Sequence, residues 1–510
     1  MLLKINPGQM TLAELRGVYR HDLKITLADH AWKDIRASRD IVEDIMARGK
    51  TVYGINTGFG LLAQTSIPAD QLTLLQSNLV LSHSTGVGKP LDDDVVRLTY
   101  VLKVSSLARG HSGIRVPTME AFMDFINSGI IAEIPEKGSV GASGDLAPLA
   151  HMTSAMMGEG FARLNGKRMK ASDALKEVNL KPVSLGSKEG LAFLNGTQVS
   201  TALALKGLFK TEDIFASAIV AGSMSIDALM GSVAPFDSRI HMARGQPGQI
   251  AVAPIYLDLM KGSEINFAHH DCKKVQDPYS LRCQPQVMGA VLDLINNSAK
   301  TILIEGNAVT DNPLIFTDNG DVISGGNFHA EPVAFAADML ALALCEIASI
   351  SERRIAIMVD PKMSDLPPFL VENSGVNSGF MIAQVSAAAL VSENKTKAHP
   401  SSVDSIPTSA NQEDHVSMAT YGARRLDDMA FNSATVIAIE LLAATQGIDF
   451  RAPYKTSEPL TKYHQHIRKI IPHYTVDRYF APDIERATDM ILAGDFSDHV
   501  MNILPSGSNI

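Results

Sequence analysis

The chain has 510 residues, of which 45% are hydrophobic and 20% are charged, a composition typical of globular proteins. Its 55 Asp and Glu side chains outnumber its 45 Lys and Arg side chains, and a formal net charge of -10 argues against a nucleic-acid-binding protein. Three cysteines give no disulfide framework and favour a reducing, cytoplasmic location. The N-terminus also lacks the basic and then apolar pattern of a signal peptide.

A chain of this length exceeds what one ordinary core accommodates, so we expect two domains. Residues 1–195 are predicted to form a mixed, mostly helical N-terminal domain, and residues 196–510 a domain of long helices. Within the first, residues 92–108 show an apolar period near 3.6 and begin with three aspartates, which predicts a helix.

Three later segments predict very long helices: about 285–306, from just after Asn327 to about 358, and about 411–447. Helices of this length need neighbours along their length, so the predicted fold is mainly α, an elongated bundle of long helices. The most apolar stretch, 333–350, contains two acidic residues, which favours a buried helix over a membrane span. A mean hydropathy of +0.07 suggests that some apolar surface is buried between subunits.

The segment KGSVGASGDLAPLAH at 137–151 raises three alternatives. It could be a tight turn before a helix that begins at Leu146 with Asp145 as N-cap. It could bind phosphate, although no lysine follows the last glycine as in a P-loop. Alternatively, the Gly144 nitrogen could attack the Ala142 carbonyl carbon and Ser143 could lose its hydroxyl as water, which would leave an electrophilic methylidene group.

One further motif, HHDC at 269–272, contains residue types that bind metals. No second cluster at ligand spacing accompanies it, so we expect no metal site.

Several motifs in a consistent order resemble the aromatic amino acid ammonia-lyases. GSVGASGDLAPLAH is similar to the family's signature, and the resemblance extends over almost the whole chain from about Tyr53. The other matching motifs are YGINTGFG at 53–60, LNGTQ at 194–198, VQDPYSLRCQPQVMG at 275–289, DNPL at 311–314 and SGGNFHAEP at 324–332.

The resemblance implies the helical lyase fold that the family shares with fumarase and aspartase. It implies a 4-methylidene-imidazol-5-one (MIO) group formed from Ala142, Ser143 and Gly144, with no dissociable cofactor. It further implies a homotetramer whose core is built by the long helices and whose active sites draw residues from more than one subunit.

Two positions bear on the substrate. Ser82-His83 and Glu413 resemble the family members that act on histidine, whereas the phenylalanine and tyrosine enzymes usually carry other residues there. A carboxylate and an imidazole suit a polar ring and would be costly beside a phenyl ring. The expected reaction is therefore deamination of L-histidine to trans-urocanate and ammonia, the first step of histidine degradation. The resemblance leaves open whether the substrate's amine or its imidazole adds to the electrophile.

The resemblance also assigns roles to individual residues. Tyr53 is the expected general base, Arg282 the partner of the substrate carboxylate, and Phe328 a residue packed against the site. Asn195, Gln276 and Tyr279 are expected to donate or accept hydrogen bonds at the electrophile or the substrate, and His83 and Glu413 to hold the imidazole ring. Gln276, Tyr279 and Arg282 are three residues apart, so a helical turn would place them on one face.

The sequence also leaves other activities open. A tyrosine or phenylalanine lyase, or an aminomutase that returns the amine to the β-carbon, would share most of these motifs. A non-catalytic helical scaffold that never cyclises its loop would share all of them.

Overall fold

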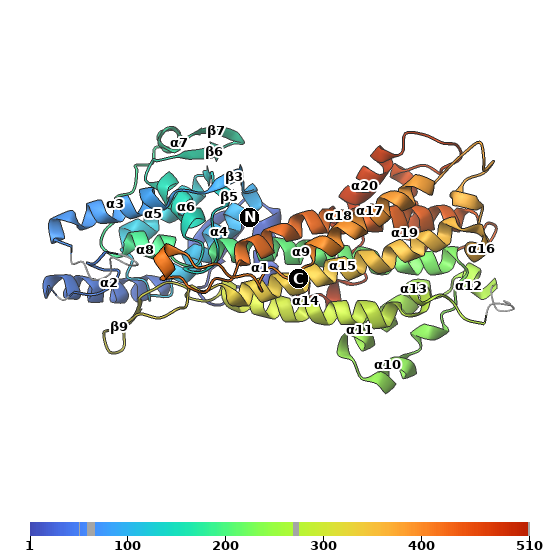
Figure 1. Ribbon diagram of the computed structural model, residues 1–510, viewed down its shortest axis with the longest axis horizontal. Helices are drawn as coiled ribbons and strands as arrows, with labels where there is room; N and C mark the ends of the chain where they lie inside the picture. Colours follow the sequence, from blue (N-terminus) through green and yellow to red (C-terminus); the bar gives the residue numbers. More distant parts are fainter. Residues whose placement is uncertain (50, 59–66, 269–274, 508–510) are drawn as a thin grey trace. The chain divides into compact units, whose positions relative to one another are not determined.

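The computed structural model describes residues 1–49, 51–58, 67–268 and 275–507, and helices dominate it (Figure 1). These residues divide into two compact units. The first unit contains Met1–Lys206, Ala299–Asp338 and Pro400–Arg424, and the second contains Gly207–Ser298, Met339–His399 and Arg425–Ile510. Each unit is thus assembled from three separate segments, whereas the predicted division at residue 195 assumed two continuous pieces. The predicted domain boundary at residue 195 therefore remains a prediction.

The first unit combines medium-length helices with short strands. The helices that lie wholly within it are α1 (Leu12–Arg20), α2 (Ala31–Ala47), α3 (Leu72–His83), α4 (Asp93–Leu107), α5 (Val116–Asn127), α6 (Leu146–Met156), α7 (Ala171–Glu177) and α8 (Glu189–Leu194). Helices α4 and α6 confirm two of the predicted helices. Twelve of the fifteen residues of α4 are buried, so this helix lies in the core of the first unit.

All strands in the described ranges lie in the first unit and form small sheets. Strand β1 (Leu2–Ile5) pairs in parallel with β2 (Lys24–Leu27), and β3 (Val87–Pro90) pairs antiparallel with β5 (Pro135–Lys137). Strands β4 (Ile131–Ala132), β6 (Phe161–Leu164) and β7 (Lys167–Lys170) form an antiparallel sheet, and β8 (Leu314–Phe316) pairs with β9 (Asp321–Ile323).

Four long helices account for much of the rest: α9 (Gln198–Ala228), α14 (Gln284–Gly306), α15 (Glu331–Val359) and α18 (Ala419–Asp449). Helices α14 and α15 agree with the predicted ranges, and the mainly α fold is confirmed. Helix α9 was not among the three predicted long helices. Almost every one of its residues is buried, so it lacks the alternation of apolar and polar faces by which an amphipathic helix is found in a sequence.

The predicted start of the third long helix was wrong by about eight residues. Asn411 ends a short 3-10 helix (Ser409–Asn411), residues 412–418 form a loop, and α18 begins only at Ala419. The backbone of Asn411 and Met418 has positive φ, which a helix excludes. The amide groups of Ser417 and Met418 instead donate to the carbonyl oxygen of Val140, so this polar segment pairs with another loop.

The remaining helices of the second unit are shorter. They are α10 (Ser238–Arg244), α11 (Pro247–Met260), α12 (Glu264–Ala268), α13 (Tyr279–Arg282), α16 (Pro361–Ser364), α17 (Met381–Lys397), α19 (Glu458–Ile470) and α20 (Ala481–Ala493). Within this unit α9 and α14 pack closely, because a Cβ atom at Gly222 would lie 2.0 Å from the side-chain oxygen of Gln284. A fully buried ion pair between Arg354 and Glu440 joins α15 to α18.

By length and composition alone, α14, α15 and α18 could each cross a membrane. Protein atoms bury 67% of the most apolar window of α15 and 89% of that of α18, against 44% for α14.

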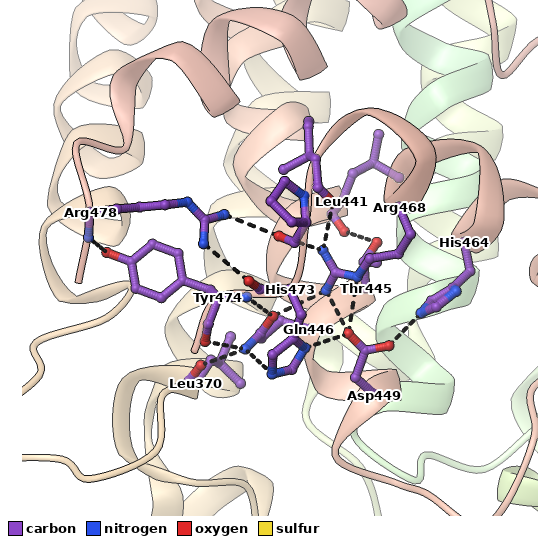
Figure 2. Close-up of polar contacts among 12 residues, drawn as sticks. Leu370, Leu441, Thr445, Gln446, Asp449, His464, Arg468, His473, Tyr474 and Arg478 are labelled. Carbon is purple, nitrogen blue, oxygen red and sulfur yellow. Dashed lines mark hydrogen bonds and ion pairs between the residues drawn. The ribbon is translucent and has the colours of Figure 1, made fainter. Parts of the chain in front are cut away.

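A polar cluster surrounds Asp449, the last residue of α18 (Figure 2). The Asp449 carboxylate accepts hydrogen bonds from His464 Nε2 at 2.6 Å, His473 Nδ1 at 2.7 Å and Arg468 Nη2 at 2.7 Å. Burial of this carboxyl opposes ionisation, but the two histidine contacts and the charge of Arg468 outweigh it and hold its pKa well below the ordinary value. The cluster therefore stabilises the ionised carboxylate in the folded chain.

Replacing Asp449 tests this account. A depressed folded-state pKa means that the stabilisation is present above the unfolded-state pKa of about 3.9 and fades as the pH falls below it. Asp449→Asn should therefore lower the free energy of unfolding by about 2–3 kcal/mol at pH 7, and by less at pH 3. Urea unfolding at both pH values measures this, with Asp428→Asn at an exposed carboxylate as the control. An equal loss at both pH values would contradict the account.

Candidate active site

The tripeptide Ala142-Ser143-Gly144 lies in a loop pressed against a second turn of backbone. Gly144 has a φ of +71° and forms an isolated bridge with Gly196. A Cβ atom at Gly144 would fall 2.2 Å from the carbonyl oxygen of Gly196, so no other residue fits. The next amide, Asp145 N, donates to that same oxygen at 2.8 Å. The contact between the two turns is therefore backbone against backbone.

The side chain of Asp145 holds the loop from behind. It occupies the N-cap position of α6, as predicted, but makes no side-chain cap hydrogen bond. Its fully buried carboxylate instead accepts from Ser139 Oγ at 2.8 Å, Thr420 Oγ1 at 2.7 Å and the amide and hydroxyl of Ser200 at 2.7 and 2.9 Å. Three segments that are distant in sequence thus meet at one ionisable group next to the tripeptide.

A cavity of about 1000 Å³ opens over the tripeptide within the first unit. Seven of the predicted site residues line it: Tyr53, His83, Ala142, Ser143, Asn195, Phe328 and Glu413. They come from the turn at 53, the end of α3, the tripeptide loop, the end of α8, the loop before α15 and the loop before α18. Positions spread over 360 residues of sequence therefore share one cavity.

Polar contacts connect the tripeptide to two of these side chains. Asn195 Nδ2 donates to the carbonyl oxygen of Ser143 at 2.8 Å. The Ser143 hydroxyl donates to Glu413 Oε1, and the other oxygen of that carboxylate accepts from Thr408 Oγ1 at 2.6 Å. The carboxylate of Glu413 is therefore held in place from within its own loop while it faces the tripeptide.

The imidazole of His83 contributes a polar surface at another part of the cavity. Burial lowers its pKa from the ordinary value, and a backbone contact with Leu79 and the charge of Glu413 only partly oppose this. Ser82 Oγ lies 3.1 Å from its Nδ1. At neutral pH the ring is therefore mostly uncharged and can both donate and accept a hydrogen bond.

Of the other four predicted site residues, Gly144 completes the tripeptide, and the remaining three lie in the second unit and are not among the residues that line this cavity: Gln276, Tyr279 and Arg282. Arg282 contacts both Gln276 and Tyr279, but only Tyr279 and Arg282 lie on a helical turn, α13, so the predicted shared helical face does not include Gln276. Arg282 Nη2 donates to Gln276 Oε1 at 3.1 Å, and the Arg282 guanidinium lies 4.6 Å from the centre of the Tyr279 ring. The Tyr279 side chain is 71% exposed. Each unit thus brings together one group of predicted site residues.

Two histidines at the cavity wall were not predicted. His329 and His415 stack with ring centres 5.8 Å apart, and His329 Nε2 lies 3.1 Å from the carbonyl oxygen of His415. This contact ties the loop that carries Phe328 to the loop that carries Glu413. His329 directly follows Phe328 in the SGGNFHAEP motif at 324–332. Its position next to a predicted site residue is the signal from which it could have been found.

The HHDC motif at 269–272 lies outside the described residues. Within the ranges that are described, no three His, Cys, Asp or Glu side chains group closely enough to hold a metal ion.

Comparison with known proteins supplies the family. The profile of the aromatic amino acid lyase family matches residues 10–469. Histidine ammonia-lyase of Aromatoleum aromaticum is 58% identical over 495 residues, 97% of this chain and 94% of that protein. The crystal structure of histidine ammonia-lyase from Trypanosoma cruzi matches with a TM-score of 0.91 and 41% identity, over 99% of this chain and 96% of that one. A tyrosine aminomutase from Streptomyces globisporus also matches with a TM-score of 0.91, at 33% identity over 97% of each chain.

The chain therefore belongs to the aromatic amino acid lyase family. Enzymes of this family use a self-formed MIO group, and the loop at 142–144 fits its formation. Ring closure joins the Gly144 nitrogen to the Ala142 carbonyl carbon and releases the Ala142 oxygen as water, and loss of the Ser143 hydroxyl releases a second water. Gly144 lacks the side chain that would clash with Gly196, and Asn195 already contacts the oxygen that the ring would keep as its carbonyl.

Substitution of Gly144 tests whether this contact is required for cyclisation. Gly144→Ala should leave the chain at the full mass of its sequence, because the added methyl group cannot fit against Gly196. Gly129→Ala is the matched control, since Gly129 also has a positive φ, +83°, but open space around the added carbon. Intact-mass measurement should find the control two waters lighter than its sequence. A Gly144→Ala chain that is also two waters lighter would refute the requirement.

Proposed function

We propose that this carbon–nitrogen lyase converts L-histidine to trans-urocanate and ammonia. The observation that carries the proposal is the polar pair in the cavity, the Glu413 carboxylate next to Ser143 and the largely uncharged His83 imidazole. Both groups hydrogen-bond an imidazole ring readily, whereas a phenyl ring would desolvate them and offer no hydrogen bond in return. The 58% identity to a histidine ammonia-lyase over nearly the whole chain supports the same substrate.

Each cavity residue then has a task in the reaction. When formed, the MIO group supplies an electrophilic carbon that no ordinary side chain offers. Asn195 Nδ2 donates to the Ser143 oxygen and stabilises negative charge that builds up there. Tyr53 removes the β-proton of the substrate at its phenolic oxygen. His83 and Glu413 hold the substrate ring, and Phe328 packs beside it.

The cluster in the second unit completes the site from a neighbouring subunit. We propose that the enzyme is a cytoplasmic homotetramer in which a partner chain supplies Gln276, Tyr279 and Arg282. The Arg282 guanidinium binds the substrate carboxylate through two parallel hydrogen bonds. Gln276 and Tyr279, which contact Arg282, orient it and add hydrogen bonds of their own. The exposure of Tyr279 in the single chain agrees with this arrangement.

The substrate assignment is tested by incubating the purified enzyme with L-histidine, L-tyrosine and L-phenylalanine. The expected result is a conjugated, ultraviolet-absorbing product and ammonia from histidine alone, with a chain two waters lighter than its sequence. Ser143→Ala should fold normally and lose turnover, because it cannot form the methylidene carbon.

Each other outcome identifies a rival. Turnover of tyrosine but not histidine would overturn the substrate, and a β-amino acid product without ammonia would show an aminomutase. A full-mass chain without turnover would show a non-catalytic scaffold.

Mixed oligomers test the shared site. Ser143→Ala and Arg282→Ala chains should each be inactive alone, but co-expression should restore activity. At random mixing about one site in four receives an intact tripeptide from one chain and an intact Arg282 from another. Gel filtration and intact mass confirm that the hybrids have formed. Hybrids that stay inactive would show that both residues act within one chain.

A further inference from the structure

Lys103 is a buried lysine whose side chain contacts the backbone of Asn195, the residue that donates to the Ser143 oxygen. It lies on α4 with 1% of its surface exposed, and its Nζ donates to the carbonyl oxygens of Ala192 at 3.1 Å and Asn195 at 2.8 Å. Both carbonyl groups belong to the C-terminal end of α8, where helix carbonyls lack partners within the helix. A positive charge at this end is favoured by the helix dipole.

Burying a lysine side chain away from water costs free energy, so its presence at this position requires an explanation. Burial lowers the pKa of Lys103 to about 7. The charged groups that face it are Asp311, Lys188 and Asp145, and Asp311 is already paired with Lys188 at 2.7 Å. Asp145 is satisfied by the four donors described above. The direct contacts of Lys103 that we observe are the two backbone carbonyl groups.

These carbonyl groups determine where Asn195 points. Asn195 is buried, and among the described residues its side chain makes one hydrogen bond, from Nδ2 to the Ser143 oxygen, while its Oδ1 has no partner there. Because no second hydrogen bond within the described ranges orients this side chain, the position of its amide depends strongly on the backbone at 195. Lys103 holds that backbone at the carbonyl group of the same residue.

We propose that Lys103 is a positioning residue: by bonding the Ala192 and Asn195 carbonyl groups it keeps the Asn195 amide against the Ser143 oxygen, the atom on which charge develops during the reaction. The proposal rests on the proposed function only for its kinetic readout. A hydrogen bond that stabilises developing charge must be held in place before the reaction, because reorientation during it would cost most of the benefit.

A double-mutant cycle between Lys103→Met and Asn195→Ala tests this. With the native Asn195, Lys103→Met should lower kcat at least tenfold and change KM less than threefold, because the lost contact acts on the developing charge. With Asn195→Ala already present, Lys103→Met should lower kcat less than threefold further, because nothing remains to be positioned. Lys103→Arg, which keeps the charge and the donors, should recover most of the turnover.

The matched control is Lys206→Met, at a second buried lysine of the first unit that pairs with Asp92 and Asp94. Its effect on kcat should be the same with and without Asn195. Intact mass measures the cyclised fraction of each variant, so that kcat is expressed per mature chain. Equal effects of Lys103→Met in both Asn195 backgrounds would overturn the proposal.

A readout without turnover separates this proposal from the substrate assignment. In Ser143→Ala chains, which cannot form the methylidene carbon, the unfolding midpoints of Lys103→Met, Asn195→Ala and the double variant should combine less than additively. Lys206→Met and Asn195→Ala should combine additively. Additive shifts for Lys103→Met would overturn the proposal even if histidine proves not to be the substrate, and so would failure of Lys103→Arg to recover turnover in a folded, cyclised chain.

Discussion

The contact between the Gly144 and Gly196 backbones is the constraint on which the active site depends. It brings a peptide nitrogen into a loop too tight for any side chain, and Asp145 closes the loop on the far side with a carboxylate that four donors satisfy. Peptide groups are normally inert towards one another. Here the fold leaves no room for a side chain at Gly144, and the family's catalytic group is made from the chain itself rather than supplied by a bound cofactor.

Charged side chains that are buried or half-buried occur within each unit, and each has at least one polar partner. Asp145, Lys103 and the Lys188–Asp311 pair lie in the first unit, while Glu440 with Arg354 and Asp449 with its histidines lie in the second. A buried charge without partners would cost several kcal/mol, so each of these groups fixes the geometry of the segments that meet at it. In this mainly helical fold, hydrogen bonds and ion pairs of a few charged side chains thus hold together segments that are distant in sequence.

Much of the fold could be predicted from the sequence, because α14 and α15 have the apolar content and length of buried helices. Helix α9 could not, because a helix buried on all sides has no polar face to reveal its period. The start of α18 was missed because Ser417 and Met418 pair with Val140, a tertiary contact with no local signal.

The candidate site was predictable only through motifs. Tyr53, His83 and Glu413 are ordinary residues when taken singly, and family resemblance is what linked them. Lys103 belongs to no recognisable motif, because its proposed role depends on contacts with the end of α8, almost ninety residues later in the chain.

The residues that contact the tripeptide loop are synthesised at very different times. Ser143 contacts Glu413, Gly141 contacts Ser417, and Asp145 contacts Thr420, so the last parts of the loop's enclosure lie some 270 residues downstream of it. A ribosome delivers residue 144 long before residue 420. The nascent chain therefore carries an open loop during most of its synthesis, and the enclosure is complete only once α18 has begun to form. The contacts of the loop with Glu413, Ser417 and Thr420 can therefore form only late in synthesis, long after the tripeptide itself has been made.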